Sequence, residues 1–230
     1  MSGGLDPRVA RGMRALLATL RARLDAGDGR LGWKLAFGSP AGMKQLGVSA
    51  PIVGFLVGSG RIEDGGTCSV RGWGRPVVEA EVAAHLAKDV PPGSGREGAA
   101  AAIGALGPAL EIVDLSDQST DVEEVLAADI YQRHVVLGRP SRGASLVGVS
   151  GLVLVDGAEV ARTEDPQEMP GELVGLVAHV ADVLGEVGER LAAGDVVITG
   201  AVVPPMPVRG GERVTFRLAP RGEVTAAFSG

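Results

Sequence analysis

The sequence predicts a β-rich α+β fold, and three observations lead to this prediction. Short apolar runs recur along the 230 residues and are separated by glycine-containing turns, of which residues 63–66 are an example. Only a few stretches carry a helical period, the longest at residues 9–24 and 170–191. The chain shows no internal repeat and no interdomain linker, so we expect one domain over residues 1–230 with a helical segment at residues 1–30.

The N-terminal helix has a clear start and a clear end. Asp6 can cap its first turn, Pro7 fits that turn, and apolar residues then recur at helical spacing as far as Leu24. Gly27 ends it. A strand, a short helix, an extended segment and a second strand should follow, at residues 31–37, 41–46, 51–57 and 68–73.

Residues 77–85 read as a strand in which two carboxylates interrupt an apolar run. Glu79 and Glu81 are two residues apart, so both side chains point to the same face. At a separation of about 6.6 Å, their repulsion is roughly 2.5 kcal/mol at an effective dielectric constant near 20. A divalent cation that accepts oxygen ligands would offset this cost. The alternative is a half-exposed edge strand whose glutamates pair with arginines.

The second half of the chain continues the pattern. Residues 96–106 are alanine-rich and predict a helix that Pro108 stops, and residues 109–114 then form a buried strand. Residues 170–191 carry the apolar stripe of what should be the longest helix. The remaining elements are a short helix at residues 121–127 and strands at residues 131–138, 151–155, 196–200, 213–218 and 224–228.

Composition excludes several classes of function. The net charge is −6, and no basic run appears, so neither nucleic acid nor an anionic membrane surface is an expected partner. Cys68 is the single cysteine, which rules out an intrachain disulfide. The first residues lack the basic and apolar regions of a secretory signal, so we expect a cytoplasmic protein. Dinucleotide, P-loop, α/β-hydrolase and zinc motifs are all missing from the sequence.

Two more charged residues interrupt apolar strands. Glu111 lies within residues 109–113, and Lys34 lies between Trp33 and Leu35. Each could belong to an ordinary ion pair, but one shared site accounts for all four anomalies more simply. Three carboxylates favour Mg²⁺ or Mn²⁺ over zinc. Of the three histidines, at positions 85, 134 and 179, the last two are interpreted as packing or hydrogen-bonding residues.

An ordered set of motifs matches one known family over nearly the whole chain. The chain resembles the fumarylacetoacetate hydrolase superfamily, in its 2-keto-4-pentenoate hydratase branch. The matching pieces are Gly32-Trp33-Lys34-Leu35, Leu46-Gly47-Val48 with Pro51, Gly54 and Leu56, the Glu79/Glu81 pair, Glu111, Ala128-Asp129, Val136-Leu137-Gly138, and Leu191 with Gly194-Asp195-Val196-Val197 and Thr199-Gly200.

The resemblance implies a mixed, rolled β-sheet with short flanking helices and a homo-oligomeric assembly. It implies a metal-dependent lyase in which Glu79, Glu81 and Glu111 hold Mg²⁺ or Mn²⁺ and Lys34 is catalytic. Leu56, Thr199 and Gly200 would contact the substrate, a small 2-oxo (2-hydroxydienoic) acid from aromatic-compound catabolism. Water addition through a chelated enolate is the expected reaction. Desolvation and the metal should together lower the pKa of Lys34 more than the carboxylates raise it, because the metal neutralises much of their charge.

Alternatives and departures remain at this point. A decarboxylase of a related oxo-diacid could use the same enolate, and a C–C hydrolase ranks lower because no histidine precedes His85. A ligand-binding paralogue that kept the metal site is the non-catalytic alternative. Its support comes from three positions that shape the family's substrate pocket and differ here: Ile52 replaces aspartate, Ile130 replaces asparagine, and Ala201 replaces serine.

Overall fold

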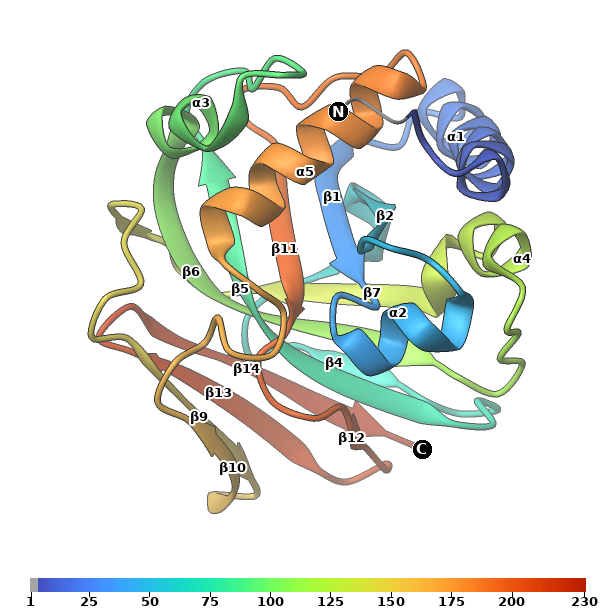
Figure 1. Cartoon of the computed structure of the whole chain (residues 1–230). Helices are drawn as coiled ribbons and strands as arrows, with labels where there is room; N and C mark the ends of the chain where they lie inside the picture. Colours follow the sequence, from blue (N-terminus) through green and yellow to red (C-terminus); the bar gives the residue numbers. More distant parts are fainter. Residues whose placement is uncertain (1–3) are drawn as a thin grey trace.

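The computed structural model describes residues 4–230 and contains two β-sheets flanked by short helices (Figure 1). Residues 1–3, which belong to the stretch expected to lack a secretory signal, lie outside the described residues. The helices are α1 Pro7–Asp25, α2 Pro40–Leu46, α3 Gly95–Ala102, α4 Val122–Ala127 and α5 Leu173–Glu186, with 3₁₀ turns at Gly58–Gly60 and Asp129–Tyr131. The predicted α+β class is confirmed.

The larger sheet is mixed and curls into half a barrel (Figure 1). β1 runs parallel to β11, whereas β5 is antiparallel to both β11 and β6. In spatial order its strands are β2 Ile52–Val57, β1 Arg30–Ala36, β11 Val196–Ala201, β5 Pro76–Leu86, β6 Ile103–Asp114, β7 Gln132–Leu137 and β3 Arg61–Ile62, with β12 Met206–Pro207 beside β5 and β8 Ser141–Arg142 beside β6.

The smaller sheet packs against β6 and β7 through β13 and β14. Its order is β10 Ala158–Thr163, β9 Ser150–Val155, β13 Arg213–Ala219, β14 Gly222–Ser229 and β4 Thr67–Ser69. On the larger sheet, α5 packs against β1, β11 and α3, while α1 packs against α4 and β2 (Figure 1). No helix among residues 4–230 combines the length and the apolar character needed to cross a membrane.

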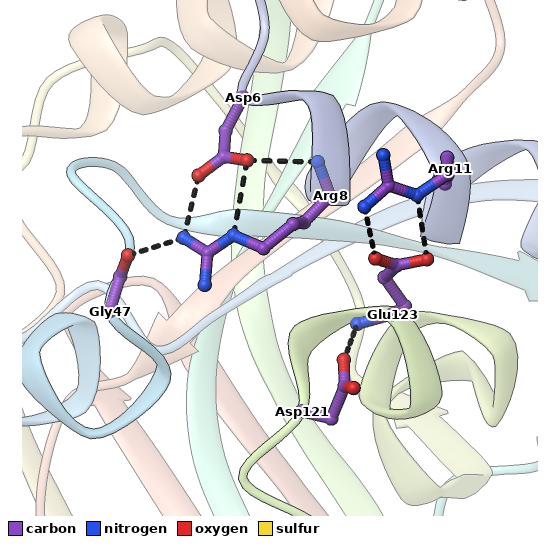
Figure 2. Close-up of polar contacts among 6 residues, drawn as sticks. All are labelled: Asp6, Arg8, Arg11, Gly47, Asp121 and Glu123. Carbon is purple, nitrogen blue, oxygen red and sulfur yellow. Dashed lines mark hydrogen bonds and ion pairs between the residues drawn. The ribbon is translucent and has the colours of Figure 1, made fainter.

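Polar contacts fasten α1 to two shorter helices (Figure 2). Asp6 caps α1 by accepting from the Arg8 backbone N–H at 2.9 Å, and the Arg8 guanidinium donates to the Gly47 carbonyl at the end of α2 at 2.8 Å. Arg11 makes two hydrogen bonds to Glu123 in the first turn of α4. The contacts therefore tie α1 to α2 and to α4.

Two predicted helices are too long. Residues 96–106 were expected to be one helix, but α3 ends at Ala102 and β6 begins at Ile103. Pro108 lies inside β6 opposite Val82, and its carbonyl accepts from the Gly138 N–H at 2.9 Å, so strand pairing overrides the local alanine propensity. The helix predicted at residues 170–191 shrinks to α5, which at 14 residues is shorter than the 19-residue α1.

One strand prediction changes, and one strand of the smaller sheet was missed. The strand expected at residues 68–73 is only β4 Thr67–Ser69, because Gly72, with φ +80°, turns the chain. β10 was not predicted at all. It is an edge strand with mostly exposed side chains, so its sequence carries no apolar alternation to reveal it.

The face of the larger sheet that carries Lys34 also carries the carboxylates. Strand partners share a face, and the register pairs Lys34 with Gly54 and Ile198, Ile198 with Ala83, and Glu111 with Glu79. A small apolar cluster lies on the same face and consists of Leu56, Ala83, Ala109, Val135, Leu137, Val196 and Ile198. The polar groups therefore stand in apolar surroundings.

Candidate functional site

β5 and β6 bring the three predicted carboxylates together. Glu79 stands directly opposite Glu111 in the antiparallel register, and Glu81 lies two residues further along β5. One carboxylate oxygen from each of the three side chains lies within 4.8 Å of the other two. The alternation of side chains along two paired strands therefore produces a compact set of oxygen atoms.

Burial leaves one of these oxygens without a partner. Glu81 is fully buried; its Oε2 accepts from the Gly200 N–H at 2.7 Å, but its Oε1 has no hydrogen-bond partner among the described residues. Glu111 is also buried and accepts from Lys34. An unpaired buried carboxylate oxygen beside two more carboxylates is costly unless a cation binds it.

The pKa values of two of the glutamates show this cost. Burial, followed by repulsion from Glu111, raises the pKa of Glu79 to about 7. The pKa of Glu81 is raised well above its ordinary value by burial and then by Glu111 and Glu79. Burial and mutual repulsion therefore favour the protonated forms of both glutamates, and a bound cation would oppose this effect.

A divalent cation fits this donor set. All the available ligand atoms are carboxylate oxygens, the type preferred by Mg²⁺, Mn²⁺ and Ca²⁺, and the described residues add no sulfur or imidazole nitrogen to the cluster. The unpartnered Glu81 Oε1 is the kind of buried acceptor that a metal ion would satisfy. The residues present therefore fit a divalent cation bound through oxygen.

Lys34 joins the carboxylate set from β1. Its Nζ donates to Glu111 Oε1 at 2.6 Å and to the Ile130 carbonyl at 3.2 Å, and the side chain is buried. β11 and β5 lie between β1 and β6, and three strand spacings in a flat sheet would be about 14 Å. The contact therefore depends on the curl of the sheet.

The pKa of Lys34 departs from the sequence expectation in the metal-free protein. Burial alone would lower this pKa, but the charges of Glu111, Asp129 and Glu79 and the hydrogen bond to Glu111 outweigh it and raise the pKa. The expected lowering applied to the site with a metal bound, so for that state it stays a prediction.

A cavity of about 360 Å³ opens above Lys34, Glu79 and Glu111. Its walls come from the segment leading into α2, from α5, and from the stretches around residues 130, 169 and 200. The wall residues are largely apolar and include Phe37, Pro51, Val113, Leu115, Ile130, Met169, Pro170, Leu176, Ala201 and Pro205. The charged groups thus lie in a mostly apolar chamber.

Two of the three predicted substrate contacts line this cavity. Thr199 and Gly200 do so, although the Thr199 hydroxyl already donates to the Val82 carbonyl at 3.2 Å and the Gly200 N–H holds Glu81. Leu56 shares the face of Lys34 but packs in the small apolar cluster and does not line the cavity. The contact proposed for Leu56 therefore stays a prediction without a place in this cavity.

Of the three positions that differ from the family pattern, two line the cavity and one does not. Ile130 and Ala201 line the cavity. Ile52 is buried in the main core and does not line it, so an influence of Ile52 on the pocket stays a prediction. An isoleucine side chain is held in the core, where a carboxylate would be too costly to bury.

Sequence reasoning noted Asp129 only as part of a motif and did not place it in the site. The structure puts this buried aspartate close to Lys34, where Asp129 Oδ1 accepts from the Phe55 N–H at 2.9 Å. Burial raises its pKa to about 7, although the charge of Lys34 and the hydrogen bond from Phe55 lower it. The sequence offered one signal for Asp129, an acidic residue between a predicted helix and an apolar strand.

The backbone at Asp129, Ile130 and Tyr131 is left-handed, with φ values of 48°, 53° and 63°. This conformation costs a residue with a Cβ roughly 1–2 kcal/mol, and asparagine, which the family carries at the middle position, tolerates it better than isoleucine. Ile130 is only 4% exposed, and burying an isoleucine contributes about 1.5–3 kcal/mol. Packing can therefore offset the strain at this position.

The histidines stay outside the carboxylate set. His179 Nε2 contacts the Pro51 carbonyl at 2.8 Å, and His134 stacks on Trp73 with ring centroids 6.1 Å apart. His85 lies on β5, but it is not part of the oxygen cluster and Arg61 is its charged neighbour. The structural roles expected for His134 and His179 stay predictions, and none of the three histidines belongs to the carboxylate cluster.

Comparison with known proteins gives several long matches. No protein-family model matches the chain. It is 30% identical to a 4-oxalocrotonate decarboxylase of Pseudomonas putida over 215 residues, 90% of this chain and 81% of that protein. It is also 30% identical to 2-keto-4-pentenoate hydratase 2 of Dechloromonas aromatica over 218 residues, 91% of this chain and 82% of that protein.

Solved structures agree with these matches. The 4-oxalocrotonate decarboxylase from Pseudomonas putida G7, complexed with calcium and acetate, superposes with a TM-score of 0.87 at 27% identity, over 94% of this chain and 84% of that chain. A second structure of that decarboxylase contains magnesium and adipate. The chain therefore has the same fold as these enzymes of 2-oxo acids, and the similarity extends over most of its length.

Proposed function

Because the chain belongs to the fumarylacetoacetate hydrolase superfamily, in the branch of the 2-keto-4-pentenoate hydratases and 4-oxalocrotonate decarboxylases, we propose that it is a hydratase of a small 2-hydroxydienoic acid. It is a lyase that depends on a divalent metal. The finer proposal is that Mg²⁺ or Mn²⁺ binds to Glu79, Glu81 and Glu111 and that water adds to the substrate to give a 4-hydroxy-2-oxo acid.

The observation that carries this proposal is the meeting of Lys34 with the three glutamates at the base of the cavity. A bound divalent cation would supply Lewis acidity towards the carboxylate and 2-oxo oxygens of the substrate. The three glutamates would hold that cation, and the Gly200 N–H would keep Glu81 oriented towards it.

Lys34 would move protons and hold negative charge. Two of its ammonium protons point to Glu111 and to the Ile130 carbonyl, which leaves one for a substrate in the cavity. As the dienol ketonises, this group would stabilise the charge that develops on the enolate and exchange a proton with it. The apolar walls would limit the access of bulk water, so that each interaction counts for more than it would in solution.

The walls favour a substrate whose far end is uncharged. Lys34 is the only cationic side chain among the described residues that line the cavity. The other polar wall groups, among them Tyr131, Gln118 and Ser39, are neutral and could offer a second carboxylate hydrogen bonds but no positive charge. A second carboxylate would be desolvated there without a counter-ion. This supports a monoacid hydratase over a decarboxylase of an oxo-diacid.

Decarboxylation of an oxo-diacid is the second candidate. One relative has that name, and the related structure with magnesium and adipate holds a dicarboxylate. A C–C hydrolase has less support, because within residues 4–230 the residues that line the cavity include no histidine to activate water. The intact set of Lys34 and three glutamates is evidence against a non-catalytic paralogue.

The product identifies the reaction. The Mg²⁺-loaded protein should consume 2-hydroxypenta-2,4-dienoate, with loss of the dienol absorbance and a product heavier by one water in mass spectrometry. In a parallel reaction with 2-oxohex-3-enedioate, we expect little release of carbon dioxide. If the enedioate loses carbon dioxide rapidly and the dienoate is not consumed, the decarboxylase candidate replaces the hydratase.

Two further proposals concern assembly and location. The family resemblance supports a homo-oligomer, and light scattering at micromolar concentration should give a mass above that of one 23.3 kDa chain. A stable monomer would contradict it. The single, buried, unpaired Cys68 is consistent with a reducing compartment, and we propose the cytoplasm.

A further inference from the structure

Three consecutive left-handed residues border the site, and none of them is glycine. Asp129, Ile130 and Tyr131 all have positive φ values, a conformation that bulky and β-branched residues rarely adopt. Strain of this kind persists only where the surroundings hold it in place, and it often accompanies function.

Both ends of the tripeptide are tied down. At its start, Asp129 Oδ1 accepts from the Phe55 N–H of β2 at 2.9 Å. At its end, the Tyr131 hydroxyl accepts from the Ser119 N–H at 2.7 Å, and the Tyr131 N–H donates to the Ala128 carbonyl at 3.1 Å. The carbonyl of Ile130, between these ties, accepts from Lys34 Nζ at 3.2 Å.

Gly54 leaves the space in which Asp129 and Lys34 meet. A Cβ at position 54 would lie 2.7 Å from Asp129 Oδ1 and 2.7 Å from Lys34 Cε. The aspartate and the lysine stem therefore both pass over the bare backbone of β2, directly beside the Phe55 N–H that holds Asp129. A tie between Asp129 and β2 thus fixes the tripeptide relative to the lysine stem.

We propose that the left-handed tripeptide is a positioning device for Lys34, and that Asp129 is the positioning residue that anchors it. The side chain of Asp129 holds the tripeptide on β2, and the Ile130 carbonyl then fixes one proton of the ammonium group while Glu111 fixes another. The third proton is directed to the substrate. This inference rests on the proposed function, because it assigns Lys34 a reacting partner in the cavity.

Three variants distinguish an anchoring role of Asp129 from an effect of its charge and from a general loss of stability. Asp129→Gly removes the anchor, and glycine tolerates positive φ, so the backbone itself is not strained. Asp129→Asn keeps an oxygen that can accept from the Phe55 N–H, and asparagine also tolerates this conformation. Asp156 is the matched control, because it too has a positive φ of 51° and its Oδ1 accepts a backbone N–H, that of Arg213, at 2.9 Å.

The expected results follow from these roles. In Asp129→Gly, kcat should fall about 10- to 100-fold, the usual effect of losing a group that orients a catalytic side chain, while KM and Mg²⁺ affinity change less than about 3-fold. Asp129→Asn should keep kcat within about 3-fold of the wild type. Asp156→Gly, which lies in the turn between β9 and β10 and away from the cavity, should leave kcat unchanged even if its melting temperature falls.

Crystal structures provide a measure that does not depend on activity. In Asp129→Gly, Lys34 Nζ should move out of hydrogen-bond distance of the Ile130 carbonyl, whereas Asp129→Asn should retain the contact. If Lys34 keeps its place in Asp129→Gly, or if Asp129→Asn loses as much kcat as Asp129→Gly, the positioning role is wrong. If the wild type turns over no 2-oxo acid, the proposed function fails, and the two crystal structures still decide the positioning inference.

Discussion

At the scale of single residues, the site is a balance between repulsion and pairing in a dry environment. Lys34 neutralises Glu111 at 2.6 Å, but among residues 4–230 Glu79 and Glu81 have no ion-pair partner of their own. Removing one partner of a buried ion pair typically costs about 3–5 kcal/mol, because the other charge is left uncompensated. Substitutions of these residues should therefore change the stability of the protein differently with and without bound metal.

Glu81→Gln should separate metal binding from folding. Glutamine can still accept from the Gly200 N–H, but it removes the oxygen that has no partner in the metal-free protein. We expect Mg²⁺ binding in titration calorimetry to be lost, while the melting temperature of the chelator-treated variant is not lower than that of the wild type. Equal Mg²⁺ binding by both proteins would rule out Glu81 as a ligand.

The pH dependence of metal binding has a definite sign. The pKa of Glu79 in the folded, metal-free protein is about 7, raised from an ordinary value of 4.5, and that of Glu81 is raised as well. Mg²⁺ must displace the protons that these groups hold, so its affinity should increase as the pH rises from 5.5 to 8. Calorimetry in two buffers with different ionisation enthalpies should detect proton release at pH 6.5. A pH-independent affinity would contradict the assignment.

The same raised pKa affects the stability of the metal-free protein. A group whose pKa is higher in the folded state stabilises the fold fully below its unfolded pKa, here 4.5, and this contribution is lost as the pH rises through about 7. In chelator, the unfolding free energy of the wild type relative to Glu79→Gln should therefore fall between pH 5 and pH 8. A constant difference, measured by urea denaturation, would show that Glu79 does not titrate there.

At the scale of elements, β2 supports the site because it has a glycine, without a side chain, where Lys34 and Asp129 meet. Gly54 lies opposite Lys34 in the register, and no side chain could be added there without meeting Lys34 and Asp129. The position of Lys34 therefore depends on packing against residues far from it in sequence.

The helices contribute to the cavity wall through the contacts in Figure 2. There Arg8 links α1 to the end of α2, a helix that lines the cavity with Gln45.

Gly54→Ala should displace Lys34 from Glu111 and the Ile130 carbonyl. The added methyl would lie 2.7 Å from both Lys34 Cε and Asp129 Oδ1, so one of them must move. We expect kcat to fall by at least about 10-fold, the order found when groups that orient a catalytic residue are disturbed. Gly60→Ala is the control, because its Cβ would be no closer than 3.5 Å to any neighbour. If the two variants lose equal activity, steric crowding at Lys34 is not the cause.

At the scale of the whole molecule, the sequence predicts which helices and strands form better than it predicts the residues at which they begin and end. Glu79 and Glu81 could be placed on one face because alternation in a strand is a local property. The contact of Lys34 with Glu111 could not be derived locally, since it depends on how the sheet curls across β11 and β5. One shared site was inferred because all four charged residues interrupt apolar strands, and the family resemblance then supplied their roles.

The errors share one physical cause. Residues 103–106 look helical alone, yet pairing with β5 makes them a strand, and the exposed edge strand β10 carries no apolar signal. Asp129 was missed because its importance depends on a left-handed backbone that no sequence pattern announces. Tertiary context decides each of these cases, whereas the site carboxylates were visible because they interrupt apolar strands.

One measurement tests the central claim most directly: the turnover of 2-hydroxypenta-2,4-dienoate by Mg²⁺-loaded wild type and Lys34→Met, with Mg²⁺ affinity measured on both. With the metal bound, Glu111 is not left unpaired by the loss of Lys34, so the variant should fold and bind Mg²⁺ nearly as well as the wild type. Its kcat should fall roughly 10²–10⁴-fold, the usual contribution of a positioned proton-transfer group. Near-normal turnover by Lys34→Met would contradict the account and leave Lys34 as a structural partner of Glu111.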